Sequence, residues 1–132
     1  MYLVDTSVWI DYLREEDTEA ALFFAVALDR GYPFGITPEI YQEVLQGAAT
    51  AEDFEQLAEY LGTQRLYGLG NGIESYRQAA GLYFRCRQAG MPVRSTKDCI
   101  VVQICLEHGL LLLHNDRDFL NISRVVPELR LA

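Results

Sequence analysis

The chain has 132 residues, half of them hydrophobic and 23% charged, with a formal net charge of −8. This length and composition fit one globular domain with a workable core and exclude a disordered chain. The negative charge argues against a general polyanion-binding protein, which is usually basic. It leaves open an enzyme whose acids hold a cation, and an acidic body also suits a basic protein partner.

Neither a membrane segment nor a disulfide framework is expected. No apolar stretch approaches the roughly 20 residues that span a bilayer. The first four residues, Met1–Val4, run directly into Asp5, without the charged region or cleavage site of a signal peptide. Cys86, Cys99 and Cys105 show no zinc or redox spacing. We therefore expect reduced thiols that fill the core of a cytoplasmic protein.

Strands and helices alternate along the first half of the chain. Thr6 or Ser7 can cap the first helix, Gly31 ends the second, and Pro38 lies in the first turn of the third. The expected elements, in order, are a strand at 2–5, helices at 7–13 and 18–30, a strand at 34–37, helices at 38–45 and 50–61, and a strand at 65–69.

The second half begins after the glycines of 68–72 and continues the alternation. Ser95-Thr-Lys-Asp98 has the form of a capping box, and Gly109 ends the helix that it opens. Helices are expected at 73–89 and 95–108, a strand at 110–113, and a last edge strand at 129–131. The whole pattern predicts an α/β fold: a single domain over 1–132, with a central parallel sheet of about four or five strands flanked by helices.

Four acids fall where such a sheet would carry its site: Asp5, Glu43, Asp98 and Asp116. Open α/β sheets bind ligands at the carboxyl ends of their strands. Like charges gathered there repel one another unless a cation is present, and hard oxygen ligands favour Mg²⁺ or Mn²⁺. The sequence therefore predicts a divalent-metal site.

Each of these acids also has a purely structural interpretation. Asp5 could cap the first helix, although Thr6 and Ser7 offer caps as well, which favours a functional Asp5. Asp98 could reach back to the Ser95 amide as a capping-box acid. Yet Asp98 shares a helical face with three apolar residues further along its helix, so this face should point inward, and both interpretations stay open.

The other two positions are also ambiguous from the residues alone. Glu39 lies one turn before Glu43 on nearly the same face, and periodicity does not choose between them. Asn115, Asp116 and Asp118 follow an apolar strand, where they fit either a turn or a metal shell.

Other familiar sites are absent. Gly68-Leu-Gly-Asn-Gly72 is not a dinucleotide-binding fingerprint, because Ile73 holds the last position. There is no phosphate-binding P-loop and no G-x-S-x-G nucleophile elbow. Ser7 stands where an aspartyl-phosphate enzyme would need a second acid, and His108 and His114 are too isolated to form a catalytic pair.

Taken together, these positions resemble the PIN-domain family, and within it the VapC-type toxins of toxin–antitoxin pairs. The resemblance covers nearly the whole chain. It is carried by the segments Val4–Ile10, Thr37–Gly47, Arg94–Ile100 and Leu112–Phe119.

The resemblance implies a role for each site position. It makes Asp5, Glu43, Asp98 and Asp116 the catalytic acids and so favours Glu43 over Glu39. Asp5, Asp98 and Asp116 would be the metal ligands, with Mg²⁺ or Mn²⁺ as cofactor. The secondary polar residues near the metal would be Thr6, Ser7, Asn115 and Asp118.

Two positions depart from the family pattern. His114 stands where many relatives place Thr or Ser, which puts a hydroxyl contact there in doubt. Lys97 stands where relatives often have an apolar or acidic residue, and it could instead hold a phosphate.

The activity implied by the resemblance is metal-dependent endoribonucleolytic cleavage of RNA by a type II toxin that inhibits translation or growth. Because RNA needs positive charge near an acidic site, the candidate contacts are Arg85, Arg87, Arg94, Lys97 and Arg117. A catalytically silent module that binds RNA or protein, and a phosphohydrolase of small esters, are the alternatives.

A homodimer and a cognate antitoxin are also implied. The candidate antitoxin surface is formed by the helices at 18–30 and 50–61. Its possible anchors, which could equally be plain core, are Leu22, Phe23, Phe24, Leu57 and Tyr60.

Overall fold

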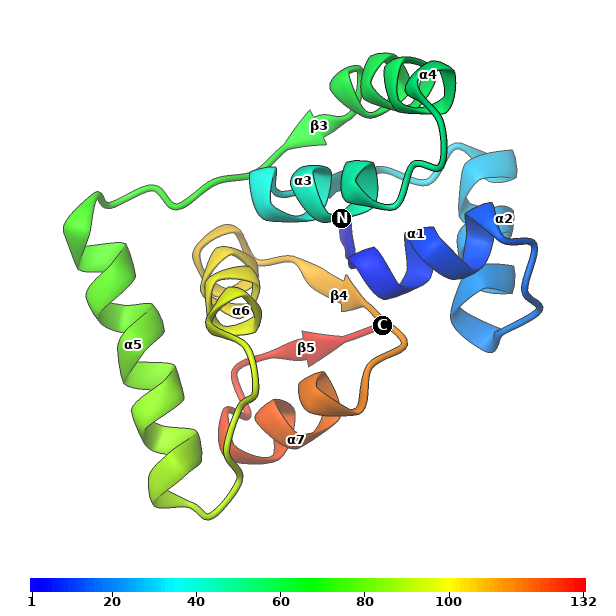
Figure 1. Ribbon diagram of the computed structural model, residues 1–132. Helices are drawn as coiled ribbons and strands as arrows, with labels where there is room; N and C mark the ends of the chain where they lie inside the picture. Colours follow the sequence, from blue (N-terminus) through cyan, green and yellow to red (C-terminus); the bar gives the residue numbers. More distant parts are fainter.

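The computed structural model describes residues 1–132, and its centre is a five-stranded sheet in the order β3-β2-β1-β4-β5 (Figure 1). All neighbouring strands are parallel. The strands are β1 Tyr2–Val4, β2 Phe34–Ile36, β3 Arg65–Leu66, β4 Leu111–Leu113 and β5 Arg130–Leu131. The predicted parallel α/β sheet is confirmed, although β3 ends earlier than the predicted 65–69.

The central strands end level with one another. Val4, the last residue of β1, is in register with Leu113, the last residue of β4, and the Asp5 amide donates to the Leu113 carbonyl at 2.9 Å. The residues that follow β1 and β4 therefore emerge side by side at the carboxyl edge of the sheet.

Seven helices connect and flank the strands. They are α1 Thr6–Leu13, α2 Glu19–Arg30, α3 Pro38–Gln46, α4 Ala51–Gly62, α5 Ile73–Gln88, α6 Thr96–His108 and α7 Arg117–Val125. Helices α1 to α4 contact one another, as do α5 to α7, and Figure 1 shows these two groups on different sides of the molecule. No helix combines the length and apolar character needed to cross a bilayer.

The order in which the chain forms the strands explains why the helices fall into two groups. The chain runs outward from β1 to β3, then returns to β4 on the other side of β1 and continues to β5. Because crossover connections between parallel strands are right-handed, this reversal sends the two helix groups to opposite faces. The reversal point, between β1 and β4, is where open α/β sheets bind ligands.

Local sequence accounts for most helix ends. The hydroxyl groups of Thr18, Thr37 and Thr50 each accept the backbone amide three residues on, and Gly31 and Gly109 adopt the left-handed conformation that ends α2 and α6.

Two capping predictions are wrong. Asp5, rather than Thr6 or Ser7, is the N-cap of α1. Ser95 makes no side-chain cap hydrogen bond, so the predicted capping box does not form. The first-turn acid of α6, Asp98, instead pairs with Lys97.

Helix α7 lies where the sequence predicts no regular element. Asp116 caps it by accepting the Asp118 amide at 2.9 Å, and its apolar side buries Phe119 and Ile122. A short helix between Asp116 and Pro127 thus completes the crossover to β5.

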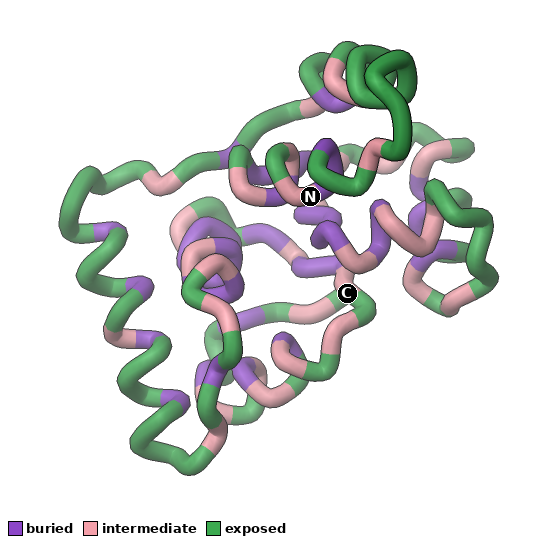
Figure 2. The backbone as a smooth tube through the Cα atoms, in the orientation of Figure 1, coloured by how far each residue is buried: buried purple, intermediate pink, exposed green.

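The core packs around aromatic residues on one side and around α6 on the other. Trp9 is fully buried, with its ring centroid 4.8 Å from that of Phe24. Figure 2 shows α6 as largely buried, whereas α5 is exposed along most of its length. Cys86, Cys99 and Cys105 are buried free thiols, which confirms their expected role as core residues.

Candidate active site at the carboxyl edge of the sheet

Asp5 leaves β1 as a buried carboxylate whose two oxygens have different surroundings. It is 2% exposed. Oδ2 accepts hydrogen bonds from the Ser7 amide at 3.1 Å and the Ser7 hydroxyl at 2.7 Å. Oδ1 is buried and has no hydrogen-bond partner. One oxygen therefore caps α1, while the other is left free for a ligand.

Glu43 reaches the same region from α3. Its Oε1 accepts the Thr6 hydroxyl at 2.7 Å and lies 2.7 Å from the Lys97 ammonium nitrogen. Glu39, one turn earlier, makes neither contact, and its own Oε1 is buried without a partner. The structure thus brings Glu43 into the cluster and leaves Glu39 outside it.

Asp98 lies in the first turn of α6 and is 3% exposed. Its pKa is raised from 3.8 to about 6, and the largest cause is burial, because a carboxylate loses hydration there. The nearby Lys97 ammonium lowers that pKa, and the charges of Asp5 and Asp116 raise it. Asp98 is therefore a carboxylate whose charged form needs a cation nearby.

Asp116 and Asp118 complete the cluster from the start of α7. Oxygens of Asp98, Asp116 and Asp118 all lie within 4.8 Å of one another. The guanidinium of Arg94, in the loop before α6, pairs with Asp118 at 3.1 Å. The strand ends, α6 and α7 together place three carboxylates in metal-binding proximity.

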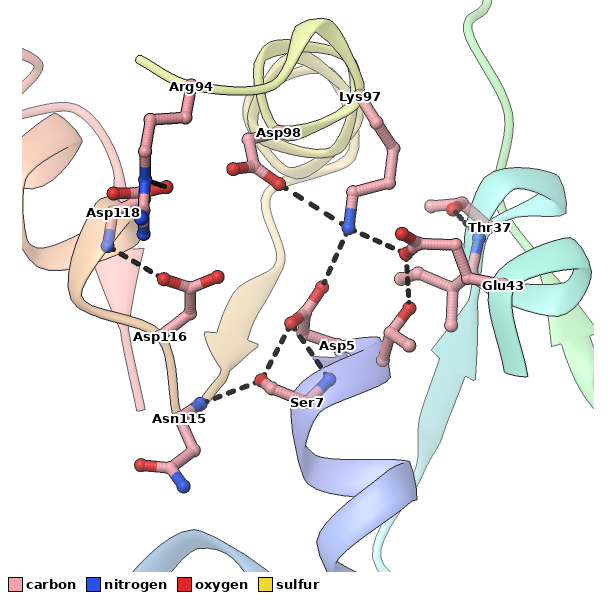
Figure 3. A network of polar contacts seen from close by, with 12 residues as sticks. Asp5, Ser7, Thr37, Glu43, Arg94, Lys97, Asp98, Asn115, Asp116 and Asp118 are labelled. Carbon is pink, nitrogen blue, oxygen red and sulfur yellow. Dashed lines mark hydrogen bonds and ion pairs between the residues drawn. The ribbon is translucent and has the colours of Figure 1, made fainter. Parts of the chain in front are cut away.

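Lys97 lies between the carboxylates of Asp5, which follows β1, and of residues in α3 and α6 (Figure 3). Its nitrogen is 2.7 Å from Glu43 Oε1, 3.4 Å from Asp98 Oδ1 and 3.8 Å from Asp5 Oδ1. Burial lowers the pKa of Lys97, but the charge of Asp5, the hydrogen bond to Glu43 and the charge of Asp98 outweigh this effect and the net pKa is raised. Lys97 is therefore a charged residue inside the acid cluster.

The secondary polar residues do not all face the acids. The Ser7 hydroxyl accepts the Asn115 backbone amide at 3.0 Å, which joins β4 to α1. The Asn115 side chain points away from the acids (Figure 3) and donates to Asp11 at 2.8 Å. Sequence reasoning did not single out Asp11, since its role depends on how the loop after β4 packs on α1.

His114, which stands where many relatives have a Thr or Ser hydroxyl, makes a hydrogen bond to the backbone. Its Nδ1 accepts the Asp116 backbone amide at 3.1 Å. Burial lowers the pKa of His114, and the charges of Asp5 and Asp116 oppose that effect without cancelling it. His114 thus helps to fix the turn that presents Asp116.

The arginines predicted to contact RNA differ in the contacts that they already make within the protein. Arg85 bonds to Glu128 and to the Val125 carbonyl, both at 3.1 Å. Arg87 lies over exposed aromatic rings of its own helix. Arg117 is exposed at the start of α7 and makes neither an ion pair nor a side-chain hydrogen bond. Arg94, Lys97 and Arg117 are therefore the basic residues placed next to the acids.

The residues present fit a hard divalent cation. The donor set consists of carboxylate oxygens, which Mg²⁺ and Mn²⁺ prefer. The buried Asp5 Oδ1 without a partner is costly unless a cation or water reaches it. Asp98, with its raised pKa, would also be stabilised in its charged form by such an ion.

Comparison with known proteins agrees with the fold. The model of the PIN domain family matches residues 2–125. The chain is 31% identical over 126 residues to the VapC ribonuclease Mb1587 of Mycobacterium bovis and to ribonuclease VapC11 of Mycobacterium tuberculosis, covering 95% of this chain and 93% of each relative.

Among solved structures, VapBC2 from Rickettsia felis bound to a DNA fragment from its promoter has a similar fold. The TM-score is 0.73 at 14% identity, over 99% of this chain and 96% of that one. The matches in sequence and in fold both extend over nearly the whole chain. The chain therefore belongs to the PIN domain family.

Proposed function

We propose that this protein is a metal-dependent endoribonuclease and the toxin of a type II toxin–antitoxin pair, which cuts RNA and so inhibits translation or growth. The observation that carries this proposal is the convergence of Asp5, Glu43, Asp98 and Asp116 at the carboxyl edge of the sheet. Support also comes from the relatives named as VapC ribonucleases, which match nearly the whole chain.

The proposed cofactor is Mg²⁺ or Mn²⁺. Asp5, Asp98 and Asp116 would be its principal ligands, with Asp118 as an additional acid. When bound, such an ion polarises the phosphate, lowers the pKa of water and stabilises the leaving oxygen.

The chain's own residues prepare this chemistry. Ser7 fixes Asp5 and Thr6 fixes Glu43, so both carboxylates are held by hydrogen bonds before substrate arrives. Asp5 and Asp98 are almost fully buried, whereas the Glu43 side chain is 40% exposed. We therefore assign Glu43 to orienting the attacking water, because solvent reaches it far more than it reaches Asp5 or Asp98.

RNA would bind through cations beside the acids, since Arg and Lys fix phosphates without reading the bases. Arg117 is the strongest candidate for a phosphate contact, because it is exposed and makes no ion pair. Arg94 is also exposed, although it is paired with Asp118. Arg85 and Arg87 remain weaker candidates, because their side chains already pack on their own surroundings.

The proposal includes a cytoplasmic location, a homodimer and a cognate antitoxin. The solved neighbour is a VapBC2 assembly, which supports an antitoxin partner. On the candidate surface of α2 and α4, Leu22, Phe23 and Tyr60 are exposed and remain possible anchors. Phe24 is fully buried and belongs to the core, so it is removed from that set.

One observation favours the alternative of a catalytically silent binding module. Lys97 neutralises part of the acid cluster from within, so the carboxylates can coexist without a metal. A silent module would hold RNA or a partner at this edge without cutting it.

Cleavage of total cellular RNA by the purified, antitoxin-free protein tests the proposal. We expect cleavage with Mg²⁺ or Mn²⁺, none with chelator, and a loss of about 100-fold or more in the Asp98→Asn and Asp5→Asn variants, which remove ligand charge. Asp29→Asn, an exposed change of the same type on α2, should cleave like the wild type.

Circular dichroism would show that each variant is folded. Cleavage that persists in chelator or in Asp98→Asn would contradict the metal mechanism. A folded wild type that binds RNA but does not cut it under either metal would favour the silent module.

A further inference from the structure

Lys97 is the single lysine of the chain, and it lies inside the acid cluster rather than on the surface. Its nitrogen is within 4 Å of an oxygen of Asp5, Glu43 and Asp98, which lie at the N-cap of α1, in α3 and in α6. An ammonium ion that meets carboxylates from three separate elements occupies a position that a metal cation would otherwise take.

The five acids of the site divide into two sets that share Asp98. In one set, Asp5, Glu43 and Asp98 surround Lys97. In the other, oxygens of Asp98, Asp116 and Asp118 lie within 4.8 Å of one another, and the cation beside them, Arg94, approaches only Asp118 from outside. One group of acids is thus occupied by the lysine ammonium, and the other has the oxygen spacing that could hold a metal ion.

A divalent ion and the ammonium group cannot both occupy the first group of acids. An ion there would need the oxygens that now face Lys97, and two positive charges at such short separations repel by several kcal/mol at about the effective dielectric of a protein site. The lysine is also anchored by its 2.7 Å contact with Glu43, which Thr6 holds in place.

We propose that the Lys97 ammonium stands in for one of two divalent ions. Of the ligands assigned above, Asp98 and Asp116 then hold the single Mg²⁺ or Mn²⁺ of the wild-type centre together with Asp118, and Asp5 faces the ammonium group instead. This inference rests on the metal dependence of the proposed function. Lys97 then supplies fixed positive charge at Asp5 and Glu43, as the compact point charge that a lysine provides. Removal of that charge opens the place of the ammonium group to a second ion.

Isothermal titration with Mn²⁺ alone, on protein freed of metal, tests this directly. The wild type should bind one ion per chain, and Lys97→Met, which keeps a similar length without charge, should bind two. Lys97→Arg should still bind one, because it keeps the charge. Arg94→Met is the matched control: it removes the cation that pairs with Asp118 and should leave one ion bound.

A second measurement needs no variant. In protein labelled with ¹⁵N-lysine, the only side-chain ammonium signal belongs to Lys97. Saturating Mg²⁺ should leave that signal protected from exchange with water, because the ion binds beside the lysine and does not displace it. Loss of the protected signal on adding Mg²⁺ would overturn the inference, even if Lys97→Met failed to fold.

The outcomes separate this inference from the proposed function. Two ions in the wild type, or one ion in a folded Lys97→Met, would overturn the role of Lys97 and leave a metal-dependent nuclease intact. A change from one ion to two without any RNA cleavage would support Lys97 and count against the nuclease. No Mn²⁺ binding by any of these proteins would overturn both.

Discussion

Two acids of the candidate site use their oxygens for separate tasks. In Asp5 and in Asp116, one oxygen accepts a backbone amide and caps the following helix. The second oxygen of Asp5 has no hydrogen-bond partner and faces the site. The structural and the functional interpretations of Asp5 are therefore compatible. Replacement by Asn keeps an amide oxygen for the cap, so it tests charge and leaves helix α1 in place.

The protonation of Asp98 should make the stability of the metal-free protein depend on pH. Its pKa is raised from 3.8 to about 6, so folding favours the protonated form. The stabilisation is complete below about pH 4 and is lost as pH rises through about 6. At pH 8, metal-free Asp98→Asn should be more stable than the wild type by on the order of 2–3 kcal/mol.

Urea unfolding of both proteins in chelator, at a series of pH values from about 4.5 to about 8, measures this difference in the free energy of unfolding. The lowest of these values lies near the acid end of the titration of Asp98. The advantage of Asp98→Asn should shrink as pH falls, and Asp29→Asn should show no such trend. An advantage that stayed constant across this range would mean that Asp98 does not titrate there.

The sequence indicates where the acids lie along the chain better than it indicates which side chains they contact. Asp5 and Asp116 follow apolar runs, and their place at strand ends is readable from the sequence alone. The choice of Glu43 over Glu39 was not, because both lie on one face of α3 and only its docking against α1 and α6 separates them. The position of Lys97 among three carboxylates needs the same packing and has no local signal.

At the scale of elements, the sequence predicted all five strands and six of the seven helices. The strands have two or three residues, too few to alternate, and were recognised as apolar runs between turns. Helix α7 was missed because its nine residues begin in a segment rich in Asn and Asp, which also fits a turn. Burial of Phe119 and Ile122 decides for a helix, and that burial is a tertiary effect.

Edge strand β3 depends on a glycine in its neighbour. A Cβ on Gly35 would lie 2.5 Å from the Tyr67 ring and 2.8 Å from the Arg65 carbonyl oxygen. Because the backbone of β3 cannot yield without breaking its pairing, Gly35→Ala should lower the free energy of unfolding by about 1–3 kcal/mol. Urea denaturation would measure it.

Gly81, on α5, is the matched control for this change. No atom lies within 4 Å of an added Cβ there, and Ala favours a helix over Gly, so Gly81→Ala should stabilise the protein by up to about 1 kcal/mol. Equal effects of the two substitutions would show that the close approach of β2 and β3 is not what restricts Gly35.

For the whole molecule, a net charge of −8 requires that any RNA be held by local cations against an unfavourable overall field. In the Asp98→Asn background, which should bind without cutting, Arg117→Ala should weaken RNA binding. It should also reduce the slope of log affinity against log salt by about 0.7, the value for one lost phosphate contact on a single strand.

Fluorescence anisotropy with a short labelled RNA at several salt concentrations provides these slopes. Arg124→Ala, at the far end of the same helix, should leave the slope unchanged. Arg85→Ala should change it less than Arg117→Ala does, because the Arg85 guanidinium is bound to Glu128. The same slope for Arg117→Ala as for Arg124→Ala would remove Arg117 from the RNA footprint.

The strand order also governs when the site can exist during synthesis. Strand β1 leaves the ribosome before the other four strands, yet it lies between β2 and β4, and β4 is made only after β2 and β3. Asp98 and Asp116 emerge after Asp5 and Glu43, so a nascent chain at first holds Asp5 and Glu43 without their partners. The proposed nuclease therefore acquires its acid cluster only after α6, β4 and the start of α7 have been made, and the ribosome that makes it is not exposed to a working enzyme before that point.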